Sequence, residues 1–310
     1  MSLFSALYDV GARFGKIVMR RAWPLHCNEN ISPFFIVGAG RSGTTLLRRM
    51  LVASEQVHIP PETYVLSQVI EHYRRNTYLE WPTLVNQCMA MFELHPEFET
   101  FHITLRPLLP KLYALPENER SLAKMLDMFY CFHAEQTGIS CSRWGDKTPM
   151  NTFVMDDIYA VFPRAKFIHL LRDGVDVVQS CMKRGLIPKL SDAASRWKEA
   201  FYAVEDFTMR HPAACRELRY EQLVSEVEVS MQTLCDWLDI AYQSKMLTAG
   251  DVKALGDMDY THYESSLKAV SEQYIGTGRR DLNDQQKQQL QAMIGQELLR
   301  LGYPKAYGDK

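Results

Sequence analysis

The pattern of apolar and polar positions predicts three short strands separated by longer helices. Residues 34–37, Phe-Phe-Ile-Val, form a continuous apolar run, which is typical of a strand buried on both faces of a parallel sheet. Further strands are predicted at 166–171 and 215–220. Apolar residues recur at helical spacing over the segments 44–54, 63–75, 121–136, 173–183, 191–210, 221–238 and 283–301. This alternation favours an α/β fold with a three-layer, doubly wound parallel sheet, within a single domain over residues 1–310.

Turn and cap signals refine these boundaries. Ser191 and Asn283 stand at predicted helix starts, where a short polar side chain can accept a hydrogen bond from a free backbone N–H. Residues 144–149, Trp-Gly-Asp-Lys-Thr-Pro, are predicted as a polar turn. The segment 247–280 is polar and contains several glycines, so we expect it to be mobile.

Two regions depart from the regular alternation. Prolines interrupt residues 76–140, which predicts an irregular helical insertion. An N-terminal amphipathic helix is predicted within residues 1–30, because apolar residues follow a helical stripe over 3–19 and arginines and a lysine lie around it up to residue 21. Such a basic helix can make peripheral contact with a membrane surface, or it can dock on the protein body with its polar face in solvent.

A glycine-rich loop follows the first predicted strand. Residues 38–45, Gly-Ala-Gly-Arg-Ser-Gly-Thr-Thr, have the spacing of the phosphate-binding pattern G-x-x-x-x-G-K-[ST], but Thr44 occupies the lysine position. A helix that begins after such a loop presents free N–H groups and the positive end of its dipole, which together form an anion site. The missing lysine argues against a P-loop kinase, which would also need Mg²⁺.

These residues resemble the 5′-phosphosulfate loop of sulfotransferases that use 3′-phosphoadenosine 5′-phosphosulfate (PAPS). Residues 166–174, Lys-Phe-Ile-His-Leu-Leu-Arg-Asp-Gly, followed by Ser180 and Arg184, are similar to the family's 3′-phosphate strand and helix. The spacing is most similar to the tyrosylprotein and Golgi-type branch. The resemblance implies a P-loop-like fold with PAPS as co-substrate, no metal, and transfer of a sulfuryl group to a hydroxyl acceptor. The insertion at 76–140 is then expected to lie on the acceptor side.

Two groups of residues are expected to bind the donor. Arg172 ends a strand, which is where open α/β sheets bind ligands, and Ser180 and Arg184 share one helix face because they are four residues apart. They suit the 3′-phosphate. The resemblance implies that the 5′-phosphosulfate meets the loop and that a tyrosine lies near the nucleotide. The corresponding residues here are Arg41, Ser42, Gly43, Thr44, Thr45 and Tyr220.

Glu62, Lys147 and Arg41 are the expected catalytic residues. Glu62 follows Arg41 by 21 residues, and in the tyrosylprotein-type family a glutamate at this spacing is the base that takes the acceptor proton. The resemblance assigns Lys147 to the bridging oxygen of the donor, although Thr148 departs from the family's Lys-Asp-Pro. Alternatively, Glu62 marks the start of a helix and Lys147 is a surface residue. In the branch that uses a histidine base, His58 would replace Glu62.

Composition narrows the function further. The chain of 310 residues has a net charge of −2, which does not suggest nucleic-acid binding. Its seven cysteines form no C-x-x-C pair, which fits reduced thiols in the cytoplasm, and no zinc pattern appears. No signal peptide or apolar run of about 18 residues is evident, so the resemblance implies a soluble, bacterial-type relative. A carbohydrate or glycolipid acceptor is expected, with tyrosine, a phenol or a small alcohol as the alternative. A binding protein without activity would need neither Glu62 nor Lys147.

Overall fold

Four parallel strands form the centre of the molecule. The computed structural model describes residues 22–27, 30–139, 143–248 and 270–308. The strands are β1 (Phe34–Val37), β2 (Gly145–Asp146), β3 (Lys166–Leu171) and β4 (Cys215–Arg219), in the order β2-β1-β3-β4. Three of them confirm the predicted strands. The short β2 lies in the segment predicted as a turn, and a bridge between His58 and Trp144 extends the pairing beyond it.

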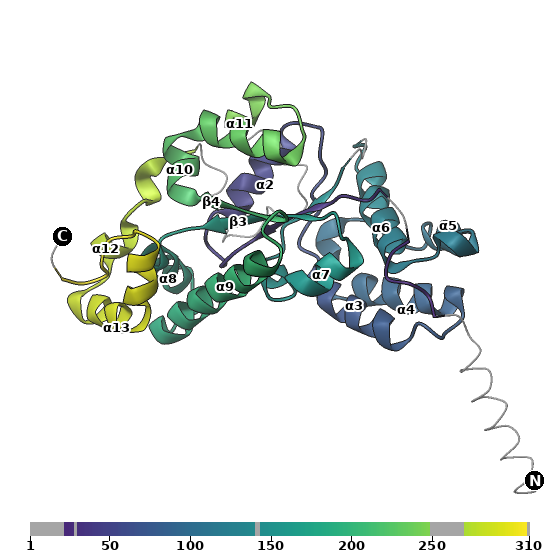
Figure 1. Ribbon diagram of the computed structural model, residues 1–310, viewed down its shortest axis with the longest axis horizontal. Coiled ribbons are helices and arrows are strands. Elements are labelled where there is room, and N and C mark those ends of the chain that lie inside the picture. The colour runs from purple at the N-terminus through teal and green to yellow at the C-terminus, as the bar shows by residue number, and fades with distance from the viewer. Residues whose placement is uncertain (1–21, 28–29, 140–142, 249–269, 309–310) are drawn as a thin grey trace, which may run out of the picture.

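Helices cover both faces of this sheet, which confirms the three-layer arrangement (Figure 1). Side chains alternate between the faces of each strand, so Phe34 and Ile36 pack on one side, whereas Phe35 and Val37 pack on the other. The first face is covered by α2 (Thr44–Val52), α10 (Tyr220–Ser225) and α11 (Val227–Leu238), and the second by α7 (Met155–Val161), α8 (Gly174–Lys183) and α9 (Leu190–Arg210).

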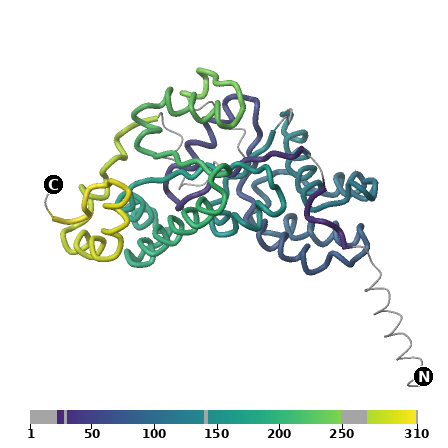
Figure 2. Tube along the Cα trace, in the orientation of Figure 1, coloured from purple at the N-terminus to yellow at the C-terminus, as the bar shows by residue number. Residues whose placement is uncertain are grey.

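The remaining helices lie at the two ends of the molecule (Figure 2). The insertion predicted at 76–140 is helical, and together with α3 it forms one end; the C-terminal helices form the other. The first group comprises α3 (Leu66–Arg75), α4 (Trp81–Glu93), η1 (Pro96–Phe101), α5 (Leu109–Tyr113), η2 (Glu117–Glu119) and α6 (Leu122–Gln136). Short 3₁₀ turns occur at η3 (Pro149–Phe153), η4 (Ser244–Thr248) and η7 (Glu272–Tyr274), and the chain ends with α12 (Thr277–Asp281) and α13 (Asp284–Arg300).

The observed helix ends confirm some of the predicted boundaries and correct others. Asn283 caps α13 as predicted, within a reciprocal capping box. Ser191 does not cap α9, because that helix already begins at Leu190 after Lys189. The helix predicted over 221–238 is divided at Glu226, where the backbone leaves the helical region. Of the segment 247–280 that was expected to be mobile, residues 247–248 belong to η4, and residues 272–274 and 277–280 belong to η7 and α12. Residues 249–269 lie outside the described residues.

The strand order creates a crevice between β1 and β3. The chain leaves β1 towards β2 on one side, and it leaves β3 towards β4 on the other. At such a switch point the following loops diverge, and ligands bind beyond the carboxyl ends of the strands. The glycine loop and Arg172 both lie there. The amphipathic helix predicted at 3–21 lies outside the described residues, and within those residues no helix has the length and apolarity to cross a membrane.

Candidate active site

The glycine loop makes a tight turn against the end of β3. Gly38 and Gly43 have φ angles of 134° and 95°, which side chains rarely tolerate. A Cβ atom on Gly38 would lie 2.6 Å from the Leu170 carbonyl oxygen, and one on Gly43 would lie 2.6 Å from the Tyr220 ring. Arg41 also has a positive φ, 71°, which is uncommon outside glycine and clusters at functional sites. The loop therefore requires glycine at positions 38 and 43.

The loop places the start of α2 at the crevice. The first hydrogen bond within the helix runs from the Leu47 N–H to the Gly43 carbonyl, so earlier N–H groups of the first turn have no partner in the helix. Thr44 and Thr45 lie in this first turn and line the cavity below it. Ser42, in contrast, is buried beneath the loop and uses its N–H to bind the Ala39 carbonyl. An anion at this helix end meets the N–H groups after Ser42.

Arg172 is held at the carboxyl end of β3 with part of its guanidinium unsatisfied. Its Nη1 donates to the Arg41 carbonyl (3.0 Å) and its Nη2 to the Tyr274 carbonyl (2.6 Å). The guanidinium lies over the Tyr220 ring, 4.4 Å from the ring centre. Its Nε is buried and has no hydrogen-bond partner, although buried donors are nearly always paired. An anion would supply the missing acceptor.

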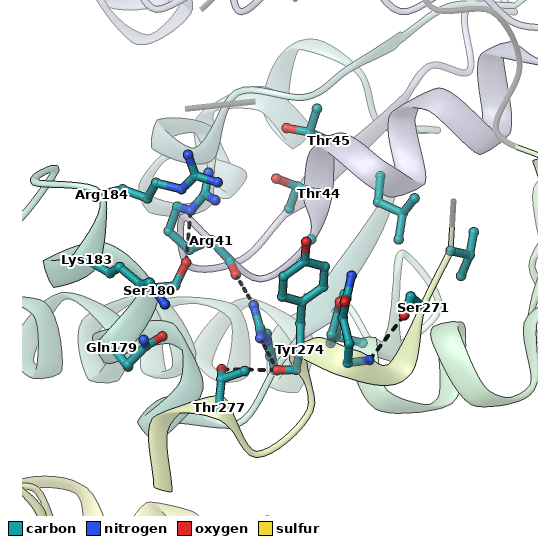
Figure 3. Close-up of a pocket in the computed structure, with 16 residues that line it drawn as sticks. Arg41, Thr44, Thr45, Gln179, Ser180, Lys183, Arg184, Ser271, Tyr274 and Thr277 are labelled. Atoms are coloured by element: carbon teal, nitrogen blue, oxygen red, sulfur yellow. Dashed lines mark hydrogen bonds between the residues drawn. The ribbon is translucent and has the colours of Figure 1, made fainter. Parts of the chain in front are cut away.

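A cavity of about 440 Å³ lies between α2, α8 and the segment 270–277 (Figure 3). It gathers most of the residues predicted to bind the donor. The predicted residues that line it are Arg41, Gly43, Thr44, Thr45, Arg172, Ser180, Arg184 and Tyr220. Arg41 reaches across the cavity wall from the loop, and its Nε donates to Ser180 Oγ (3.3 Å). Cations and hydroxyl groups from three separate elements therefore face one space.

Several lining residues were missed from the sequence. Gln179 and Lys183 are four residues apart on α8, on a face next to that of Ser180, and helical spacing from that serine would have found them. Both contact Asp281 Oδ2, at 2.7 and 3.3 Å. Residues 270–277 gave no local signal, because they reach the cavity only through the tertiary fold.

Carboxylates at the start of α8 hold the segment that follows residue 270. Asp176 accepts hydrogen bonds from the backbone N–H groups of Gly276 and Gly278, both at 2.8 Å. Asp173 forms an ion pair with Arg279 and accepts the Val175 N–H. Burial raises the pKa of Asp173 to about 6, although the arginine opposes the shift. The far wall of the cavity is thus fixed to the same helix that carries Ser180.

Glu62 and Lys147 meet in a buried ion pair outside the cavity lining. The Lys147 Nζ donates to Glu62 Oε1, and the two side chains are 1% and 9% exposed. Lys147 is therefore not the surface lysine of the alternative interpretation. Glu62 does not begin a helix either, because α3 starts at Leu66 with Val65 before it and no side-chain cap. The structure brings together the two residues that were predicted to act on the reacting groups.

The alternative base, His58, is enclosed elsewhere. Its Nε2 lies 2.8 Å from His133 Nδ1, and His58 is 3% exposed. Burial, with His133 and Arg48 nearby, lowers the pKa of His58 to about 3. A histidine with so low a pKa is a poor proton acceptor. Within the described residues, no three or more His, Cys, Asp or Glu side chains gather where they could hold a metal ion.

Comparison with known proteins decides the family. The sequence model of the sulfotransferase family matches residues 33–244, from the start of β1 to the start of η4. The chain belongs to the sulfotransferase family. It is therefore an enzyme of sulfuryl transfer, and the matched region includes the glycine loop, Glu62, Lys147 and Arg172.

Individual relatives of this sulfotransferase are distant. Protein-tyrosine sulfotransferase 1 of Danio rerio is 25% identical over 293 residues, covering 90% of this chain and 74% of that protein. An omega-hydroxy-beta-dihydromenaquinone-9 sulfotransferase of Mycobacterium tuberculosis is 26% identical, covering 67% and 63%. The sulfotransferase domain from the curacin biosynthetic pathway superimposes with a TM-score of 0.60 at 19% identity, over 89% of this chain and 99% of the domain. That likeness shows a shared fold.

Proposed function

We propose that this sulfotransferase binds PAPS in the 440 Å³ cavity and transfers its sulfuryl group to the phenolic hydroxyl of a tyrosine. The cavity carries the proposal, because it joins a helix N-terminus to the buried Arg172, whose Nε lacks an acceptor. A donor with anionic groups at both ends of a nucleotide fits such a site. Thr44 in place of the lysine is consistent with this donor, because sulfuryl transfer does not require a lysine that binds a γ-phosphate.

The lining residues divide between the two ends of this donor. Gly43, Thr44 and Thr45 present N–H and hydroxyl donors for the 5′-phosphosulfate, and Arg41 adds positive charge beside them. Ser180 and Arg184, with Arg172 at the strand end, suit the 3′-phosphate. The donor supplies the sulfuryl group and its phosphate leaving group; the protein holds both in place and neutralises their charge.

Glu62 takes the acceptor proton, and Lys147 stabilises the oxygen that leaves. A carboxylate works as a base when it receives the proton as the new bond forms. Glu62 and Lys147 lie in contact, so the attraction between their opposite charges offsets part of the cost of burying each side chain. Transfer then requires the acceptor hydroxyl to reach Glu62 from the side of the donor.

Tyrosine is favoured as acceptor over the carbohydrate or glycolipid expected from the sequence. The relatives that support this choice are named protein-tyrosine sulfotransferases, in Danio rerio and other animals. The mycobacterial relative is named for a hydroxylated menaquinone, so an alcohol is the second candidate. The acceptor-side role of residues 76–140, the single domain, and the cytoplasmic location remain predictions.

Radiolabelled PAPS offers a direct test. The purified chain is incubated with labelled PAPS and, separately, with a tyrosine-containing peptide, its phenylalanine counterpart, an aliphatic alcohol, a carbohydrate and a glycolipid. Without added Mg²⁺, we expect the tyrosine peptide to be labelled and its phenylalanine counterpart to stay unlabelled. A thermal-shift panel with PAPS, 3′,5′-ADP, ATP and GTP accompanies it. Stabilisation by ATP with Mg²⁺ but not by 3′,5′-ADP would contradict the donor assignment and favour a kinase.

A further inference from the structure

The turn that carries Glu62 is tied to the segment that carries Lys147 by hydrogen bonds of their sequence neighbours. The Thr63 N–H donates to Thr148 Oγ1 (2.9 Å), and the Thr63 hydroxyl donates to Asp146 Oδ2 (2.9 Å). Each member of the ion pair is therefore next to a residue that links the two segments. Two contacts of this kind, only one residue away, leave the pair little freedom to separate.

Asp146 is the centre of this linkage. It is 1% exposed, and three side chains donate to its carboxylate: Thr63, Tyr130 through its hydroxyl (2.6 Å) and Asn151 through Nδ2 (2.9 Å). Burial raises the pKa of Asp146, while the hydrogen bonds from Tyr130 and Thr63 oppose that shift. Burying a carboxylate costs free energy unless its oxygens accept hydrogen bonds, and both oxygens of Asp146 accept them. The carboxylate thus holds the side chains of Thr63, Tyr130 and Asn151 in place, because each donates a hydrogen bond to it.

The other side of the linkage is equally constrained. Consecutive residues of an extended segment point in opposite directions, so Asp146 faces Tyr130 of α6 while Lys147 faces Glu62. Arg48 of α2 adds two hydrogen bonds to the Ile59 carbonyl (3.2 and 3.1 Å), just before the Glu62 turn. The turn that carries Glu62 is thus held by Arg48 of α2 and, through Asp146, by Tyr130 of α6.

We propose that Asp146 is a positioning residue, which holds Thr63 and thereby sets Glu62 in register with Lys147. This inference rests on the proposed function, since it concerns the same base and lysine. Asp146 acts through Thr63, without touching either substrate. A reacting group displaced by about 1 Å can lose on the order of 100-fold in rate. The buried carboxylate therefore contributes to turnover, in addition to its part in the fold.

Kinetic variants test this role. Thr63→Val keeps the shape of the side chain and removes the hydroxyl, and Asp146→Asn removes the charge. We expect each to lower turnover at saturating substrates by about 10- to 100-fold, with 3′,5′-ADP affinity unchanged within about twofold. Thr63→Ser restores the hydroxyl and should recover most of the lost turnover. If Asp146→Asn does not fold, Thr63→Val decides the question.

Asp127→Asn is the matched control. Asp127 of α6 accepts a hydrogen bond from Nε1 of Trp144 (2.9 Å), the residue two positions before Asp146. It has no hydrogen bond or ion pair with Thr63, Glu62 or Lys147 in the described structure. Its turnover should stay within about twofold of the wild type. A general loosening of the fold would lower the turnover of this variant as well, and it would weaken 3′,5′-ADP binding in all variants together.

A second measurement does not depend on activity. Lys147 is 1% exposed, so an amine-acylating reagent should modify it slowly in the wild type. In Thr63→Val we expect acylation of Lys147, followed by peptide mass spectrometry, to be at least about fivefold faster because the pair opens more often. Wild-type turnover and wild-type acylation in Thr63→Val would overturn the proposal. Should the wild type transfer no sulfuryl group, the proposed function fails, and the acylation rates alone decide whether Asp146 and Thr63 hold the pair.

Discussion

Replacing Glu62 with glutamine separates the catalytic assignment from a structural one. Glu62→Gln keeps the size of the side chain but cannot accept a proton, so turnover should fall by about 10² to 10⁴. The affinity for 3′,5′-ADP should change little, because the residues that line the donor cavity are untouched and Glu62 is not among them. Turnover at saturating donor and acceptor, with donor affinity from calorimetry, measures both.

The buried ion pair sets the cost in stability. Removing one partner of a buried pair typically costs about 3–5 kcal/mol, because the remaining charge is left uncompensated. Lys147 is 1% exposed, but the glutamine oxygen can still accept its hydrogen bond, so we expect about 3 kcal/mol, at the lower end of that range. Denaturant unfolding would measure it. Combining Glu62→Gln with Lys147→Met should cost less than the sum of the two single changes.

An exposed ion pair provides the control. Lys111 and Glu135 lie 3.3 Å apart with side chains 56% and 58% exposed. Glu135→Gln should therefore cost less than about 1 kcal/mol and leave turnover unchanged. Near-wild-type turnover in Glu62→Gln would refute the base assignment, even if stability fell as expected. In that case the ion pair would be structural, and the base would have to be sought elsewhere.

Three further predictions follow from the donor cavity and the core. The protein should bind 3′,5′-ADP about 100-fold more tightly than 5′-AMP in calorimetry without Mg²⁺, and Arg184→Ala should remove about tenfold of that preference. Gly43→Ala should abolish measurable 3′,5′-ADP binding and lower the melting temperature, because its Cβ would meet the Tyr220 ring at 2.6 Å with φ at 95°. Burial lowers the pKa of His169 from 6.5 to about 4, so the unfolded chain binds a proton that the folded chain does not, and stability is lost as pH falls from 6.5 towards 4. This histidine alone contributes about 3 kcal/mol to that loss, and His169→Gln should reduce it in urea unfolding at pH 7 and pH 4.5.

Each of these three predictions can be contradicted by a specific result. Equal affinity for 5′-AMP and 3′,5′-ADP would remove the 3′-phosphate site. Gly40 is the control for Gly43, since a Cβ there meets nothing within 4 Å, and equal loss in both alanine variants would show that the loop tolerates no side chain at all. If His169→Gln left the pH dependence unchanged, the loss of stability would have to come from His58 and His133, whose pKa values burial also lowers, to about 3 and about 4.

The sequence predicted most elements whose signal is local. Phe34–Val37 is apolar throughout, and Asn283 has a glutamine three residues later, so β1 and α13 could be predicted from neighbouring residues. The two-residue strand β2 could not. Its residues are polar or glycine, and they form a strand only because β1 and the His58 segment lie on either side. The break at Glu226 likewise has no proline or glycine to announce it.

The candidate site divides in the same way. Gly43, Arg172 and Ser180 lie in segments with recognisable spacing, so their convergence on one cavity could be predicted from the strand-loop-helix pattern. Tyr274 could not, since it follows a long polar segment and reaches the cavity through tertiary contacts. In the sequence, Asp146 is one polar residue of a predicted turn. Its role depends on donors from Tyr130 and Asn151, which no sequence spacing connects to it.

The two sets of charges in the site differ in what they need for stability. Glu62 and Lys147 neutralise each other within the protein, so they can remain buried whether or not a ligand is present. Among the described residues, Arg172 hydrogen-bonds to two carbonyl oxygens, with Asp176 at 3.7 Å, and its Nε has no hydrogen-bond partner. Burying the Arg172 Nε–H without an acceptor lowers the stability of the fold. The structure thus separates a buried ion pair, whose charges offset each other, from a buried cation that lacks an acceptor. The proposed function assigns proton transfer to the first and the anionic donor to the second.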